Sequence, residues 1–391
     1  MKVLLTILAM FYLSTASVAV AQTSPYVNNV TYTVEPVANV NFVQAPQLNT
    51  VQTRGYHFGK AYNPAPAQVS VLQPSSKFIG GYLNYIQAQD KVRCGTNTKL
   101  RPFARLEDGI WYGIDADICK AIAIAILGDA DKIEMVNVEA GDVHKALANG
   151  QIDIMLSGTP MKGISEINGG VENAGLLYYD QQLLMVDDED KKPDDYRGKK
   201  VCLSTNSDYY RNFEEFNLKH NLNATYLTFG NLDKVREAFL LKRCQMMTAS
   251  ALILSGIKQS MSKTSAKIYP DQIAITPIYA TVRSYNEELR LAVKWILNAL
   301  LLAEQYGING QNINFYASHN NPEIRNLMGD NPELWRSLGL RPFWLNDAIR
   351  LLGNYGEIYD RNIGVDSEYN IERKQGKLLK DGGTVYPLPF M

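Results

Sequence analysis

The sequence predicts an α/β protein of two lobes, each a mainly parallel sheet flanked by helices. Short apolar strands alternate with helical patterns between residues 91 and 156, and the same alternation begins again at residue 201. A charged, turn-rich stretch at 187–200 separates the two series. Apolar strands that alternate with helices favour parallel sheets covered on both faces, with right-handed crossovers.

The composition supports a folded protein whose partners are not polyanions. The 391 residues are 46% hydrophobic and 20% charged, which allows a sizeable core. The formal net charge is -1, so no basic excess favours nucleic acid or an anionic membrane. We therefore expect a small-molecule or protein partner and no nucleic acid.

Residues 1–21 have the pattern of a secretory signal peptide. Lys2 precedes an apolar run at 3–13, and the small residues Ala19 and Ala21 precede Gln22. The run is shorter than the roughly 20 apolar residues of a membrane span. We therefore expect export through a cleaved signal peptide.

Residues 22–78 form a linker rich in Val, Asn, Gln and Pro, with few charges. Valines recur at every third position from Val34 to Val43, which suits an extended strip. Such a strip serves either as a flexible, disordered extension or as a tether that adds to the sheet edge of a partner.

The folded part divides into three segments. Residues 79–186 form the first part of lobe 1, 187–283 form lobe 2 with the hinge, and 284–391 return to lobe 1 with C-terminal helices. DQIAITPIYATVR at 271–283 is interpreted as a loop. Expected strands are 91–97, 133–138, 152–156, 201–204, 224–229 and 244–248, and expected helices are 115–127, 141–150, 207–220, 231–243 and 287–307. A ligand is expected between the lobes, since domain interfaces favour small-molecule sites.

Four cysteines lie in the exported part: Cys94, Cys119, Cys202 and Cys244. An even number in an oxidising compartment predicts two disulfides, and the wide spacing disfavours a metal site. If Cys94 joins Cys119 and Cys202 joins Cys244, each bridge would contribute about 3 to 4 kcal/mol. No cofactor motif is present, because the glycine pairs lack phosphate-loop spacing.

Several segments together resemble the periplasmic general L-amino-acid-binding proteins of ABC importers, in the polar-amino-acid class of solute-binding proteins. They include VRCGTNTKLRPF, ALANGQIDIML, YYDQQLLMV, DYRGKKVCL and GNYGEIYDRNIG, in the same order from residue 79 onward and covering both cysteine pairs. The resemblance implies a type II periplasmic-binding-protein fold, a periplasmic location and an ABC permease as partner.

The residues that hold an amino acid in that family are only partly present. The family binds the ligand's α-carboxylate with an arginine and a helix start in the first lobe, and its α-ammonium with an aspartate after the last strand of the second lobe. Here Thr159 can cap the helix, but Glu166 follows Ser165 where the family has arginine. Ser250 takes the place of the aspartate. Removing one partner of a buried ion pair costs about 3 to 5 kcal/mol, so we expect altered ligand specificity.

Eight residues are candidates for ligand contact. Lys162 either replaces the missing cation or neutralises Glu166 at i, i+4. Phe103 is either core or a stacking wall, and each hydroxyl is either a ligand contact or a local cap. The candidates are Phe103, Ser157, Thr159, Lys162, Glu166, Thr205, Asn206 and Ser250.

Three functions follow from these observations. The first is a solute-binding protein of an amino-acid-type importer with a cationic, polyhydroxylated or peptidic ligand. The second is an interaction or structural module of a cell-envelope assembly that binds an envelope protein through residues 22–78. The third is an enzyme with Glu166 as general acid; the four histidines lie in no nucleophile or metal motif, so we expect no enzyme.

Overall fold

In a computed structural model of the chain, the described residues are 81–98, 101–157, 170–188, 193–205, 207–261, 265–316 and 318–390. The expected signal peptide and linker lie outside these residues. So do four of the candidate ligand contacts, namely Thr159, Lys162, Glu166 and Asn206.

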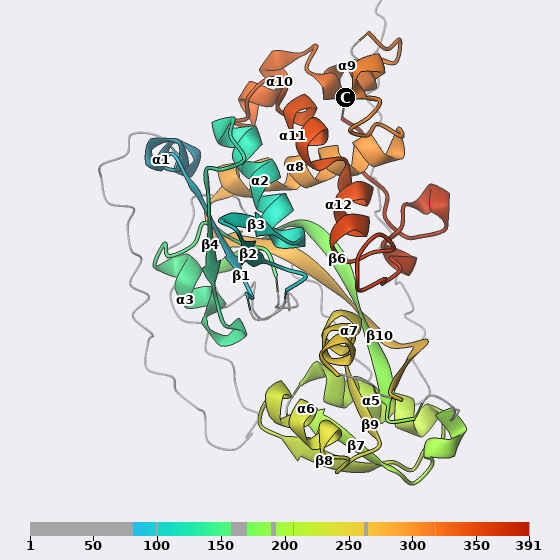
Figure 1. The fold of residues 1–391 in the computed structure, drawn as a ribbon. Coiled ribbons are helices and arrows are strands. Elements are labelled where there is room, and N and C mark those ends of the chain that lie inside the picture. The colour runs from blue at the N-terminus through green and yellow to red at the C-terminus, as the bar shows by residue number, and fades with distance from the viewer. Residues whose placement is uncertain are drawn as a thin grey trace, which may run out of the picture. The chain divides into compact units, whose positions relative to one another are not determined.

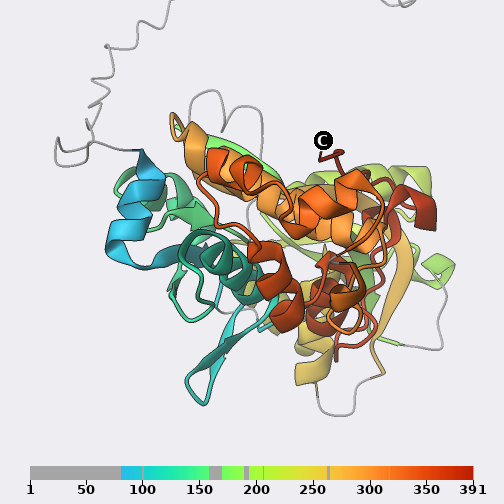
Figure 2. The ribbon, with the colours of Figure 1, turned by 90° about the horizontal axis from the view of Figure 1, so that it is seen from above.

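The first lobe contains the parallel strands β4 (Ile133–Asn137), β1 (Val92–Thr96) and β5 (Ile154–Met155). The hairpin of β2 (Arg105–Glu107) and β3 (Ile110–Tyr112) precedes its central helix. In Figure 2 the orange to red C-terminal helices lie beside the teal elements of this lobe. Its helices are α1 (Tyr82–Gln89), α2 (Ile114–Leu127), α3 (Val143–Ala148), α8 (Glu287–Gln305), α9 (Pro322–Met328), α10 (Pro332–Ser337), α11 (Trp344–Leu352) and α12 (Tyr355–Asn362).

The second lobe repeats this plan with the parallel strands β8 (Thr225–Phe229), β7 (Lys200–Ser204) and β9 (Met246–Ser250). Its helices are α5 (Asp208–Lys219), α6 (Leu232–Leu240) and α7 (Ala251–Ser260). Successive side chains of a strand point to opposite faces. Accordingly, Met246 packs in one apolar cluster and Met247 in another, so both faces of this sheet are covered.

Two long strands, β6 (Val171–Val186) and β10 (Lys267–Arg283), run between the lobes (Figure 1). They pair antiparallel from Val171 opposite Arg283 to Val186 opposite Lys267. The interpretation of 271–283 as a loop was therefore wrong. Ile278, Ala280 and Val282 are buried at every second position, which is the period of a strand. The resulting sheet has the order β4-β1-β5-β10-β6-β9-β7-β8.

Each lobe carries one disulfide. Cys94 on β1 joins Cys119 on α2, and Cys202 on β7 joins Cys244 just before β9. All four residues are fully buried. Each bridge thus links a parallel strand to another segment of the same lobe, which restricts the unfolded chain more than the folded one.

The segment after α12 contacts both lobes, although the sequence indicated only the first. Ser255 Oγ on α7 donates to the carbonyl of Tyr369 at 3.2 Å, and Gln259 Nε2 donates to the carbonyl of Glu368 at 2.8 Å. Ile371 packs against the core of each lobe. The C-terminal segment therefore connects α7 of the second lobe to the helices of the first.

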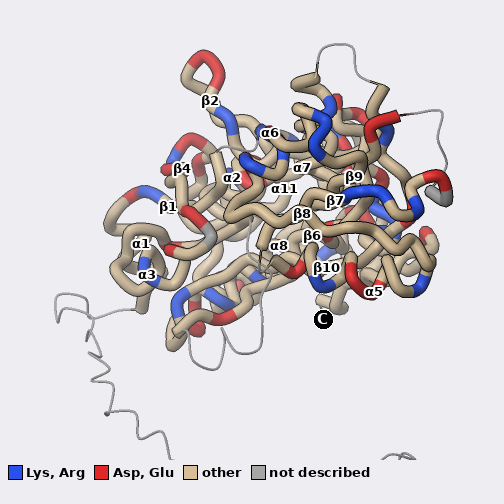
Figure 3. Tube along the Cα trace, turned by 90° about the horizontal axis from the view of Figure 1, so that it is seen from below, with Lys and Arg blue, Asp and Glu red and all other residues tan. Residues whose placement is uncertain are grey.

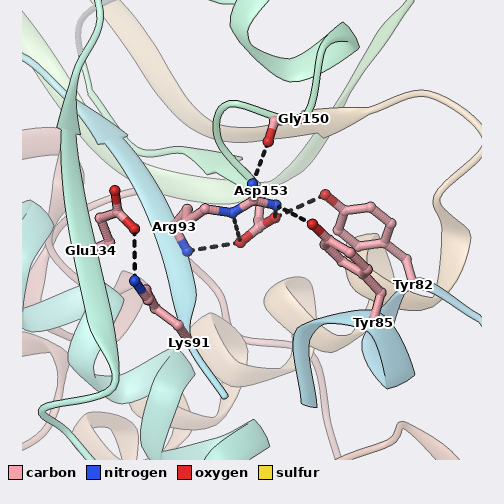
Figure 4. Close-up of polar contacts among 7 residues, drawn as sticks. All are labelled: Tyr82, Tyr85, Lys91, Arg93, Glu134, Gly150 and Asp153. Carbon is pink, nitrogen blue, oxygen red and sulfur yellow. Dashed lines mark hydrogen bonds and ion pairs between the residues drawn. The ribbon is translucent and has the colours of Figure 1, made fainter. Parts of the chain in front are cut away.

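A buried ion pair fixes the start of the first lobe (Figure 4). Asp153, just before β5, accepts hydrogen bonds from the Arg93 backbone N–H at 2.7 Å and from the Tyr82 hydroxyl at 2.8 Å. It also pairs with the Arg93 guanidinium at 2.5 Å. The Asp153 side chain is 1% exposed, whereas the nearby Lys91 and Glu134 side chains are 49% and 48% exposed.

We predict that Asp153→Asn lowers the free energy of unfolding by about 3 kcal/mol, because it leaves the Arg93 charge without its buried partner. Glu134→Gln breaks the neighbouring exposed pair and should cost less than about 1 kcal/mol. Urea unfolding of both variants measures the difference. Equal losses would contradict the anchoring role of Asp153.

Candidate functional site

The strand β6 carries a polar run in the middle of apolar sequence. Gln181 and Gln182 are both buried, and their amides are satisfied. Gln182 Nε2 donates to the Tyr209 carbonyl at 2.9 Å and to Thr248 Oγ1 at 3.0 Å. Gln181 Nε2 donates to the Glu372 carbonyl at 2.7 Å. The two glutamines therefore attach β6 to the second lobe and to the C-terminal segment.

Asp180, the residue before these glutamines, is surrounded by hydroxyl groups. The Tyr209 hydroxyl donates to Asp180 Oδ2 at 3.2 Å, and the nearby Ser250 side chain also favours the ionised form of this carboxyl. Burial nevertheless raises the pKa of Asp180 to about 6. Within the described part of the chain, Asp180 has no ion pair.

The first lobe contributes a second carboxylate, Asp115, at the start of α2. Gly113 permits this start, because its φ is +120° and a Cβ there would lie 2.2 Å from the Phe103 carbonyl oxygen. The hydroxyls of Thr96 and Ser157 both bond to Asp115, and the Thr96 distance is 2.7 Å. Burial raises the pKa of Asp115 to about 7 against these two hydrogen bonds. Asp115 is thus a fully buried group held by hydroxyls.

An aromatic pair lies near these two carboxylates. Phe103 stacks on Tyr178 of β6 with ring centroids 6.1 Å apart. Burial raises the pKa of the Tyr178 hydroxyl well above its usual range, and the charges of Asp180 and Asp115 act in the same direction. Tyr178 therefore lies within electrostatic reach of both carboxylates.

Three of the candidate residues contribute to this cluster. Phe103 stacks on Tyr178, and Ser157 accepts the Asn97 backbone N–H at 3.0 Å while bonding to Asp115. Ser250 caps α7 by accepting the Ile253 backbone N–H at 3.3 Å. The hydroxyls of Ser157 and Ser250 thus form local hydrogen bonds, which was the alternative to ligand contact. A ligand-binding role for Phe103, Ser157 and Ser250 stays a prediction.

Thr205 has a different environment from the other described candidates. It is exposed, and its hydroxyl donates to the Phe229 carbonyl at 3.0 Å, which closes the turn after β7. A ligand contact by Thr205 likewise stays a prediction.

Sequence reasoning missed the residues at the centre of the cluster, namely Asp180, Tyr178, Tyr209 and Asp115. A usable signal existed for Asp180. The run DQQ interrupts the apolar strand residues LLYY and LLMV, and a carboxylate in a buried strand requires a partner. Tyr209 and Asp115 lack such a signal, because they meet the cluster only through the folding of distant segments.

The described residues give little evidence of a nucleic-acid surface, a metal site or a membrane-spanning helix. Positive and negative residues are interspersed along the chain in Figure 3, in accord with the net charge of -1. In the described part, no three His, Cys, Asp or Glu side chains gather as metal ligands. None of the described helices has both the length and the apolar character of a membrane span.

Comparison with known proteins agrees with this fold. An ABC transporter periplasmic binding protein from Brucella ovis, solved with glutathione bound, superimposes with a TM-score of 0.72 at 29% identity. The match covers 79% of this chain and 99% of that protein. Fold and sequence together define a bacterial solute-binding protein.

The family model and the curated relatives make the assignment specific. The model for bacterial extracellular solute-binding proteins, family 3, matches residues 92–307, and the chain belongs to this family. The chain is 29% identical over 330 residues to the putative amino-acid ABC transporter-binding protein YhdW of Escherichia coli (strain K12), covering 83% of this chain and 97% of YhdW. It is 30% identical over 313 residues to the general L-amino acid-binding periplasmic protein AapJ of Rhizobium johnstonii, covering 78% and 92%.

We predict that the free energy of unfolding falls as pH rises from about 5 to about 7. Asp115 and Asp180 have raised pKa values, so in this range the folded state binds more protons than the unfolded state. Each group contributes a slope of at most about 1.4 kcal/mol per pH unit.

Urea unfolding at several pH values measures this slope. Asp115→Asn and Asp180→Asn should each flatten it, whereas Asp271→Asn, at an exposed position on β10, should not. An unchanged slope in both cluster variants would contradict the desolvation of these carboxylates.

Proposed function

We propose that this chain is the periplasmic solute-binding component of an ABC importer for amino-acid-type solutes, exported by a cleaved signal peptide at 1–21. The relatives support this proposal, since YhdW is named a putative amino-acid ABC transporter-binding protein and AapJ a general L-amino acid-binding periplasmic protein. They support neither the envelope module nor the enzyme. An ABC permease is then the partner that receives the solute.

The observation that carries the proposal is the polar cluster on β6, the strand shared by the two lobes. Phe103 and Asp115 reach this cluster from the first lobe, and Tyr209 and Ser250 reach it from the second. A solute bound here would contact both lobes. Binding would therefore favour the conformation in which the lobes grip the solute, and a permease can recognise such a conformation.

We further propose that the solute is a small amino-acid derivative or peptide. Glu166 and Ser250 stand where the general amino-acid-binding proteins have an arginine and an aspartate. Each such replacement removes a charge partner of a free amino acid, which should weaken its binding free energy by about 3 to 5 kcal/mol. The Brucella ovis protein holds glutathione, a peptide with one free ammonium group, which makes this class a suitable first test.

A thermal-shift panel of the purified mature chain tests the ligand class. It compares glutathione and other small peptides with the twenty common L-amino acids. We expect a concentration-dependent rise in Tm with a small peptide, because a ligand that binds only the folded state stabilises it. No rise with any member would contradict solute binding, and a large rise with common amino acids would contradict the altered specificity.

A further inference from the structure

The second lobe lacks an acidic residue at Ser250, the position where a ligand ammonium would be expected, yet a carboxylate lies beside it. We infer that Asp180 on β6, which accepts a hydrogen bond from the Tyr209 hydroxyl and lies beside Ser250, receives the ammonium group of the bound solute. This inference rests on the proposed function and specifies how that site recognises its ligand.

The register of β6 and β9 brings Asp180 to this position. Gln182 pairs directly with Ser250 across the antiparallel ladder, so their side chains share one face of the sheet. Asp180 lies two residues before Gln182 and therefore on the same face. Its Cα is a diagonal neighbour of Ser250, about 7 Å away. Compared with an aspartate at the position of Ser250, the negative charge of Asp180 thus lies farther along the sheet toward the first lobe.

The environment of Asp180 differs from that of the other shielded carboxylates. Asp153 pairs with Arg93, Glu304 pairs with Arg373, and Asp117 pairs with Arg361. Asp180 has the Tyr209 hydroxyl as a partner and no cation in the described part of the chain. A carboxylate that has lost most of its solvent and has no cation is costly, and a ligand ammonium would reduce that cost.

Among the described residues Asp115 also has no cationic partner, but a ligand cannot use it in the same way. Asp115 is fully buried, and the Thr96 and Ser157 hydroxyls bond to its carboxylate. Asp180 keeps partial exposure. Of these two carboxylates, only Asp180 is open to a ligand.

The hydroxyl groups around Asp180 suit an ammonium ion. An ammonium group has three N–H donors and no acceptor, and a hydroxyl that donates one hydrogen bond keeps lone pairs that can accept. Tyr209 donates to Asp180 and so retains this capacity. The carboxylate supplies the charge, and the hydroxyl oxygen supplies an additional acceptor.

The test measures the binding of two ligands to two proteins, the wild type and one variant. The two ligands differ only in whether they carry a free ammonium group. Isothermal titration compares the wild-type chain and Asp180→Asn with glutathione and with glutathione acetylated on its glutamyl nitrogen. The dipeptide L-alanyl-L-glutamine and its N-acetyl derivative form a second pair. Asp271→Asn serves as a matched control, because Asp271 is an exposed carboxylate on the other long strand.

We expect Asp180→Asn to weaken binding of the free-amine ligand by about 100-fold or more, as expected for loss of a desolvated charge pair. The acetylated ligand should bind weakly to both proteins, with less than about a threefold difference between them. Asp271→Asn should bind both ligands as the wild type does. Tyr209→Phe should weaken the free-amine ligand by about tenfold, because it removes a hydroxyl that orients the carboxylate.

The outcomes separate this inference from the proposed function. If the wild type binds a free-amine ligand and Asp180→Asn binds it equally well, the inference is overturned and solute binding stands. If Asp180→Asn weakens both members of a ligand pair equally, its effect is structural and the inference is again overturned. If the wild type binds neither pair, both the inference and the proposed ligand class fail. Far-ultraviolet circular dichroism and thermal unfolding establish that each variant is folded.

Discussion

The antiparallel pairing of β6 with β10 is the constraint on which the rest of the structure depends. It joins two sheets that are parallel in themselves, and it sets the face on which each side chain of β6 lies. A slip of one residue would turn Asp180 away from Tyr209 and Ser250 and would also invert the apolar positions that follow it. Fold and site are therefore specified by the same ladder.

Gln181 and Gln182 of β6 have structural roles beside Asp180, the residue proposed to bind the solute. Gln182 bonds to the Tyr209 carbonyl, which fixes the start of α5, and the hydroxyl of the same tyrosine reaches Asp180. Gln181 bonds to the Glu372 carbonyl in the C-terminal segment, which in turn contacts α7. The strand that carries Asp180 thus contacts both the second lobe and the C-terminal segment.

Much of the fold could be predicted from the sequence, because its signals are local. The helices at 114–127 and 287–305 follow from apolar periodicity, and the alternation of strands and helices predicts two parallel sheets. The strand β10 was missed because its pairing partner β6 lies about 100 residues earlier in the chain. That pairing is a long-range property with no local signal.

The site could be predicted only in part, and for the same reason. Ser157 and Ser250 were found by position relative to a family pattern and Phe103 as either core or a stacking wall, and all three belong to the cluster. Asp180 was missed because the family pattern was compared only at the position of Ser250. The carboxylate lies instead on the neighbouring strand β6, two residues before the partner of Ser250. Only the register of β6 and β9 brings it beside Ser250.

The most direct test of the central claim is the number of protons released when glutathione binds at pH 6. Asp180 has a pKa of about 6 in the free protein and would have to be ionised to hold an ammonium group. Titration calorimetry in two buffers of different ionisation enthalpy should therefore show release of about half a proton at pH 6 and almost none at pH 8. Binding heats that are the same in both buffers at pH 6, or equal proton release by Asp180→Asn, would contradict the account.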